Sequence, residues 1–138
     1  MRLEVTGDVR EAVEGRPVVV TGLSIGLTDT WLDPSWLDPE ALVLPLDYAS
    51  SVGPDLARTA VLVADHVPQF EAVRTGPAWG DYPAASAWTG DLLDAPRPRG
   101  RVVCQNLGNG LSDLVVAAAV VDAAEGQGAG HLLDTGSA

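Results

Sequence analysis

Four short apolar runs recur along this chain, and they constrain its fold more than any other feature. They cover residues 17–23 (PVVVTGL), 41–46, 60–64 and 101–104. Each run is continuous rather than alternating, and the first is rich in β-branched residues, as is typical of strands that are buried on both faces of a sheet. Stretches with helical character separate the runs. This alternation predicts an α/β fold with a Rossmann-like parallel sheet and flanking helices.

The remaining elements follow from local signals. Asp8 and Glu11 have the spacing of a capping box, which predicts a short helix over residues 9–14, after a short strand at residues 2–5. Further helices are expected at 54–59, 69–74, around 84–93 and, as a long C-terminal helix, at 112–125. That last helix has few polar positions, so we expect it to be nearly surrounded by protein and to end at Gly126.

Polar residues follow several of the predicted strands. Ligands bind at the carboxyl ends of parallel strands, so residues 21–24, Asp47, Asp65 and residues 105–106 are expected on one rim. Asp47 is the most informative of these because it ends a buried run, where loss of hydration makes a carboxylate costly. Two interpretations stay open for it: a cap on the next turn, or a group placed there for chemistry. Asp65 is interpreted as a cap or a ribose-facing residue.

The charge balance excludes several classes of function. The chain has 19 acidic residues and 8 basic ones, for a formal net charge of −11, and every basic residue is Arg. This balance repels a phosphate backbone and an anionic bilayer, so neither nucleic acid nor a membrane surface is an expected partner. The absence of Lys excludes a Schiff-base amine and a P-loop lysine.

Other residue types indicate the compartment and the missing motifs. The single cysteine, Cys104, lies in an apolar run and predicts a buried thiol in a reducing compartment. The N-terminus lacks an apolar signal region and the longest apolar run, residues 114–121, is too short to span a bilayer, so a cytoplasmic location is expected.

His66 and His131 do not have metal-ligand spacing, so no metal is assigned. The strand-associated GxGxxG of dinucleotide-binding domains does not occur.

Five segments, in order, resemble the C-terminal part of the ornithine cyclodeaminase/mu-crystallin family. They are EVTGDVREAVEGRPVVVTGLS (4–24), WLDPEALVLPLDYASS (36–51), VLVADHVPQFEAVR (61–74), TGDLL (89–93) and GRVVCQNLGNGLSDLVVAAAVVDAA (100–124). The resemblance implies that residues 1–104 form the second half of a Rossmann-like NAD(P)-binding domain. It implies that residues 105–138 form a C-terminal helical return segment and tail. Family members are more than twice as long, so this chain would begin after their Gly-rich phosphate loop.

The resemblance also implies a chemistry and a set of site residues. The family transfers a hydride between NAD or NADP and the Cα–N bond of an amino acid or cyclic imine. Asp47 matches the family's general acid/base, and the positions that match the family's substrate contacts are Asp47 and Leu107. The positions that match cofactor contacts are Leu23, Ser24, Leu46 and Asn106.

Three interpretations of function remain open. The chain is a partial enzyme of this family that is incomplete on its own, or a non-catalytic binding or oligomerisation module derived from the family, or an unrelated small α/β domain. Half of a Rossmann sheet leaves an open edge and an exposed apolar face, which favours pairing with another chain. The expected partner is therefore a second copy or the missing N-terminal half.

Overall fold

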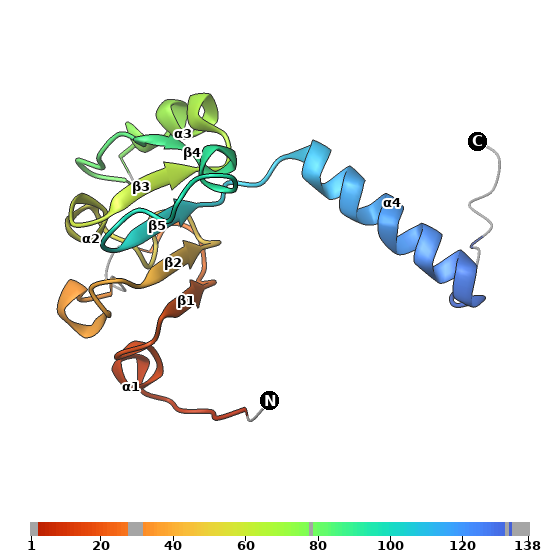
Figure 1. Ribbon diagram of the computed structural model, residues 1–138, viewed down its shortest axis with the longest axis horizontal. Helices are drawn as coiled ribbons and strands as arrows, with labels where there is room; N and C mark the ends of the chain where they lie inside the picture. The colour runs from red at the N-terminus through yellow and green to blue at the C-terminus, as the bar shows by residue number, and fades with distance from the viewer. Residues whose placement is uncertain (1–2, 28–31, 78, 132, 134–138) are drawn as a thin grey trace. The chain divides into compact units, whose positions relative to one another are not determined.

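The computed structural model describes residues 3–27, 32–77, 79–131 and 133 (Figure 1). Within these residues one five-stranded sheet forms, and every strand pairing in it is parallel. Its spatial order is β1-β2-β5-β3-β4. The strands are β1 (Val18–Thr21), β2 (Leu42–Pro45), β3 (Val61–Ala64), β4 (Ala87–Trp88) and β5 (Val102–Gln105). The predicted α/β class with a parallel sheet is confirmed.

Short helices precede or connect these strands, and a long one follows the last strand. The α-helices are α1 (Val9–Val13), α2 (Pro54–Arg58), α3 (Val67–Arg74) and α4 (Gly110–Gln127). Two 3₁₀ turns, η1 (Pro34–Trp36) and η2 (Thr89–Leu92), complete the elements. The predicted N-cap of α1 is present, since the Asp8 carboxylate accepts hydrogen bonds from the amides of Arg10 and Glu11. The reciprocal bond of a capping box is replaced: the Asp8 amide donates to the Thr6 hydroxyl, which donates to Glu11.

One face of the sheet carries the main core. In the strand register Val19 pairs with Val43, Val43 with Val103, and Val103 with Leu62. These four side chains point to the same face and are almost completely buried. Helices α2 and α3 cover this face through Leu56, Ala57 and Phe70.

The opposite face is covered unevenly. Val63, Val102 and Cys104 form a small buried cluster there, against which Leu92 of η2 packs. At the β1 end of the same face, by contrast, Val18 is 51% exposed and Val20 is 59% exposed. The predicted buried thiol of Cys104 is confirmed. The predicted burial of the first strand on both faces is wrong, because nothing among the described residues covers the outer face of β1.

Three local predictions also differ from the structure. Residues 3–5 of the predicted first strand form no strand. The predicted helix around residues 84–93 is wrong: strand β4 and the turn η2 form instead, because the Ser86 amide and hydroxyl both donate to the Leu62 carbonyl and align this segment with β3. Helix α4 passes through Gly126 and ends at Gln127, with Gly128 in the left-handed conformation that closes a helix.

The chain falls into two compact units, Met1–Leu107 and Gly108–Ala138. The second unit contains α4, all of whose residues are described, and none of its side chains is buried. The expectation that this helix is surrounded by protein is therefore not met within its own unit. No helix in the described ranges is both long and apolar enough to cross a bilayer.

Candidate functional site

The carboxyl ends of the strands meet at one edge of the sheet because every ladder is parallel. We call this edge the rim, and define it as residues 21–27, 46–52, 65–66 and 105–107. It contains each residue that the sequence singled out as a site candidate. The rim is thus the place where a ligand site in this fold is expected.

Asp47 lies in the interior of the rim, with none of its surface exposed. Its Oδ2 accepts a hydrogen bond of 2.9 Å from the amide of Leu23, and its Oδ1 accepts one of 2.9 Å from the Ser51 hydroxyl. The Ser51 hydroxyl in turn lies 2.6 Å from the hydroxyl of Thr21. The carboxylate therefore ties the end of β2 to the end of β1, and its desolvation is offset by two hydrogen bonds.

The turn after Asp47 has an unusual backbone. Tyr48 has a φ of 58°, the left-handed region that favours glycine. Its ring packs against Trp79, with ring centroids 5.8 Å apart. Ser50, two residues later, accepts a 3.0 Å hydrogen bond from the Gly26 amide. Together with the bond between Leu23 and Asp47, this contact fastens the segment after β1 to the segment after β2 at two points.

A second carboxylate organises the other side of the rim. Asp65 directly follows β3, and its Oδ1 accepts hydrogen bonds from the amides of His66 and Leu107. It therefore fixes the segment after β5, which contains the candidate substrate residue Leu107. Asp47 and Asp65 each follow a buried apolar run in the sequence. That shared position was the sequence signal for a carboxylate that caps the segment after a strand.

Gln105, at the end of β5, connects the two sides. It is fully buried, and its Nε2 donates to the Tyr48 carbonyl at 3.2 Å and to the Tyr82 hydroxyl at 2.6 Å. Desolvation raises the pKa of Tyr82, the bond from Gln105 lowers it, and the nearby Asp47 charge raises it further. Sequence reasoning placed Gln105 on the rim without a role and did not identify Tyr82, since nothing in the loop around it indicates burial.

The remaining candidates lie on the outer surface of the rim. Leu23, Ser24 and Leu46 are exposed, whereas Asn106 and Leu107 are half-buried. The side-chain Nδ2 of Asn106 donates to the Cys104 carbonyl. Leu107 packs against the main core. One of these candidates, Leu23, lines a sizeable hollow, and Thr21 and Ser51 line it too. The other candidate site residues lie outside this hollow.

That hollow is a groove of about 510 Å³, which we call the β1 groove. It lies between the C-terminal half of β1, helix α1 and the segment that carries Leu32 and Trp36. A much smaller hollow, of about 30 Å³, lies between residues 25–27, residues 48–50 and Trp79. The rim therefore has a buried polar interior and one open side, along β1.

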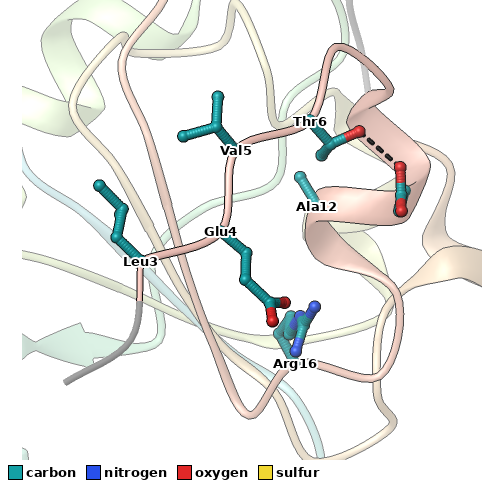
Figure 2. Close-up of a pocket in the computed structure, with 7 residues that line it drawn as sticks. Leu3, Glu4, Val5, Thr6, Ala12 and Arg16 are labelled. Carbon is teal, nitrogen blue, oxygen red and sulfur yellow. Dashed lines mark hydrogen bonds between the residues drawn. The ribbon is translucent and has the colours of Figure 1, made fainter.

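A further hollow of about 530 Å³ lies between the N-terminal segment and α1 (Figure 2). Thr6 donates a hydrogen bond to Glu11 on its wall, and the side chains of Glu4 and Arg16 point toward one another (Figure 2). It contains no residue of the rim. No three His, Cys, Asp or Glu side chains in the described part of the chain lie close enough together to hold a metal ion.

The fold defines a class: an α/β protein with an all-parallel five-stranded sheet and polar residues at the carboxyl ends of its strands. The crystal structure of CmnK has a similar fold, with a TM-score of 0.69 and 24% sequence identity. The match covers 98% of this chain and 44% of that chain, so this chain spans less than half the length of the protein it matches. This likeness shows the fold alone. Neither a family model nor a curated protein matches the sequence.

Proposed function

We propose that this chain forms the nicotinamide-facing and substrate-facing part of an NAD(P)-dependent enzyme. The enzyme would act on the C–N bond of an amino acid or cyclic imine, as in the ornithine cyclodeaminase/mu-crystallin family. The observation that carries the proposal is the buried carboxylate of Asp47 between the ends of β1 and β2. The carboxyl edge of a parallel sheet is where such folds bind their ligands.

The rim residues fit one part of a dinucleotide. Leu23 and Leu46 expose apolar side chains at the strand ends, and such side chains suit the face of a nicotinamide ring. Ser24 and Asn106 add polar groups beside them. Bound there, a nicotinamide supplies a hydride donor or acceptor. The sequence contains no Gly-rich phosphate loop after a strand, so these residues would account for the nicotinamide side only.

Asp47 is the residue that would exchange a proton with the substrate nitrogen. Each of its oxygens accepts one hydrogen bond and retains a second acceptor position. A substrate ammonium group could therefore be held by a charge-assisted hydrogen bond while the Ser51 hydroxyl keeps the carboxylate oriented. Leu107 would pack against the carbon part of the substrate.

Access to Asp47 requires a movement of the rim, because its side chain is fully buried. Hydrogen bonds from the Leu23 amide to Asp47 and from the Gly26 amide to Ser50 help to hold residues 22–27 against residues 47–51. We propose that substrate binding separates residues 22–27 from residues 47–51. A site that opens and recloses in this way would exclude water during the proton transfer.

The proposal includes the setting in which the enzyme works. The chain would be incomplete alone and would act with the missing N-terminal half, as a homo-oligomer, in the cytoplasm. These statements rest on the resemblance and on the share of CmnK that the match covers.

The test begins with the coding DNA upstream of Met1. We expect it to encode a Gly-rich phosphate loop, either in frame or in a neighbouring gene. Co-expression of that segment with this chain should give a protein that changes the fluorescence of NADH or NADPH and turns over amino acids or cyclic imines. Asp47→Asn should then lower kcat by about 10²–10⁴-fold, the usual effect of losing a general acid/base.

Asp94→Asn is the matched control, because Asp94 is an exposed aspartate outside the rim. It should leave kcat and nucleotide binding unchanged. Equal activity in the Asp47→Asn and wild-type proteins would exclude a catalytic role for Asp47. The proposal as a whole would be wrong if the assembled protein neither binds nor oxidises a nicotinamide nucleotide.

A second candidate function is a non-catalytic binding module, and the exposed apolar side chains favour it. Val18 and Val20 on the sheet, and Leu111, Leu114, Val115, Val116, Val120 and Val121 on α4, are each more than half exposed. Such surfaces indicate a partner. A chain that binds a protein partner tightly but leaves nicotinamide fluorescence unchanged would support this function instead.

A further inference from the structure

The buried side-chain amide of Gln105 joins three segments of the chain. Gln105 is the last residue of β5, and none of its surface is exposed. Its Nε2 donates to the Tyr48 carbonyl, in the turn after β2, and to the Tyr82 hydroxyl, in the loop after α3. The backbone of Gln105 is itself held by the sheet, since it pairs with Ala64 and its carbonyl accepts a 3.0 Å hydrogen bond from the Asp65 amide. Gln105 is therefore a fixed point to which the turn and the loop are attached.

This arrangement does not satisfy the whole side chain of Gln105. Its Oε1 is buried and has no hydrogen-bond partner among the described residues. A buried polar atom without a partner lowers the stability of the folded state. Gln105 thus places its two donors at the expense of its acceptor, and local violations of this kind are typical of functional sites.

The Tyr48 carbonyl is the partner that connects Gln105 to the proposed acid/base. Tyr48 directly follows Asp47, and its φ of 58° is unfavourable for a residue with a side chain. Such a conformation persists only where surrounding contacts hold it. The contact with Trp79 acts on the ring of Tyr48, whereas the bond from Gln105 acts on its backbone. The backbone of this turn sets the direction in which the Asp47 side chain leaves the chain.

We propose that Gln105 is a positioning residue for Asp47 and acts through the carbonyl of Tyr48. In the proposed opening of the rim, residues 22–27 move away and the Leu23 amide leaves Asp47. The bond between Gln105 and Tyr48 does not involve residues 22–27, so it can persist while the rim is open. Gln105 would then keep the carboxylate directed at the substrate nitrogen.

This inference rests on the proposed function, because it assigns Gln105 a role toward the proposed acid/base. The two can fail separately, since the test below reads the geometry of the rim in this chain alone and uses neither a nucleotide nor a substrate.

The test is amide hydrogen exchange, read residue by residue by NMR, in the whole chain and its variants. Gln105→Met gives a side chain of similar length without a hydrogen-bond donor. It should speed exchange at the Leu23 amide, which donates to Asp47, by at least about tenfold. The Gly26 amide, which donates to Ser50 in the segment after the same turn, should also exchange faster.

Two matched variants separate positioning from a general loss of stability. Tyr82→Phe removes one partner of Gln105 and retains the other, so exchange at Leu23 should stay as in the unchanged chain. Val103→Ala leaves a cavity in the main core, on the same strand and the same face as Gln105. It should speed exchange at the Val102 amide, which is hydrogen-bonded within the sheet, but not at Leu23.

A double variant tests the route through Tyr48. Asn adopts the left-handed conformation more readily than Tyr, so Tyr48→Asn reduces the need for a contact that holds this backbone. Adding Gln105→Met to Tyr48→Asn should therefore speed exchange at Leu23 by a smaller factor than adding it to the unchanged chain. A residue that only packs the core would give the same factor in both backgrounds.

Three results would overturn the proposal. They are unchanged exchange at Leu23 and Gly26 in folded Gln105→Met, an equal acceleration in Tyr82→Phe, and equal factors in the two backgrounds. If Gln105→Met fails to fold, the unchanged chain decides the question. A scalar coupling across the hydrogen bond between the Gln105 Nε2 and the Tyr48 carbonyl carbon should then be detectable by NMR, and its absence would also overturn the proposal.

Discussion

Strand β5 and helix α4 have similar side chains and opposite environments. The four residues of β5 (VVCQ) are all buried, whereas none of the eighteen residues of α4 is, although its centre reads LVVAAAVV. Position in the fold explains the difference: β5 is the central strand, with β2 and β3 on its two sides. Apolar sequence indicates that a segment needs cover, but it does not indicate that its own chain provides that cover.

Strand β1 lies between these two extremes. One face of β1 is buried through Val19, while the other face and the outer edge are open. Hydrophobic side chains in this molecule therefore have three environments: buried on both faces in β5, buried on one face in β1, and exposed on α4.

The largest expected difference is between two leucines that both lie in helices. Leu56 of α2 is 1% exposed and Leu114 of α4 is 65% exposed. Leu56→Ala should lower the free energy of unfolding by about 2–5 kcal/mol, because it leaves a cavity in the main core. Leu114→Ala should change it by less than about 0.5 kcal/mol, because it removes no buried contact. Urea denaturation followed by far-UV circular dichroism measures both.

Equal and large losses for the two variants would show that α4 is covered in solution. A repeat at several protein concentrations would then tell whether the cover comes from another copy, since a loss that shrinks on dilution requires association.

A second prediction concerns alkaline pH and the buried tyrosine. Desolvation raises the pKa of Tyr82 in the folded state, so the unfolded state releases its proton first as pH rises. The stability that Tyr82 contributes is present below about pH 10 and falls above it, by about 1.4 kcal/mol for each pH unit. Tyr82→Phe should remove this part of the decline between about pH 10 and pH 11.5 in urea titrations.

Tyr48→Phe is the matched control. This variant retains Tyr82, so it should retain the fall in the free energy of unfolding that Tyr82 causes at alkaline pH. Burial also raises the pKa of the Cys104 thiol, so Cys104 also lowers the free energy of unfolding as pH rises. Both variants retain Cys104 and share this effect. If the pH dependence of the Tyr82→Phe and Tyr48→Phe proteins were the same, the Tyr82 hydroxyl would not be buried in the folded chain.

The smallest expected difference is between two serines. Ser51 is buried and joins Asp47 to Thr21, whereas Ser112 is exposed in the first turn of α4. Ser51→Ala should cost about 0.5–1.5 kcal/mol, the net value of a buried hydrogen bond. Ser112→Ala should cost less than about 0.5 kcal/mol. Thermal unfolding of the two variants and the wild type, at one protein concentration, compares them, and a smaller effect at Ser51 would show that water replaces its hydroxyl.

The sequence allowed much of the fold to be predicted. Four of the five strands were predicted to within two residues at each end, because long β-branched and apolar runs are a strong local signal. β4 was missed because it has two residues and an Ala-rich sequence, and its strand geometry comes from Ser86 bonding to Leu62 rather than from propensity. The insertion of β5 between β2 and β3 depends on long-range pairing, which no local pattern encodes.

The rim shows the same division between local and long-range information. A carboxylate at the end of a buried run could be identified from sequence, and so Asp47 and Asp65 were found. The partners of these carboxylates could not be predicted, because the Leu23 amide lies 24 positions from Asp47 and the Leu107 amide lies 42 positions from Asp65. The roles of Asp47, Leu107 and the proposed cofactor contacts remain predictions for the experiments above.

The left-handed backbone at Tyr48 limits how this turn can vary. A non-glycine residue there costs about 1 kcal/mol or more, so its ring must compensate through contacts such as the one with Trp79. Glycine would relieve the backbone but remove one of the three ring contacts of Trp79, whose others are with Phe70 and Tyr82. A β-branched residue would fit neither requirement. Substitutions at position 48 and at position 79 should therefore be accepted or rejected together, which couples the aromatic packing beneath the rim to the orientation of the carboxylate beside it.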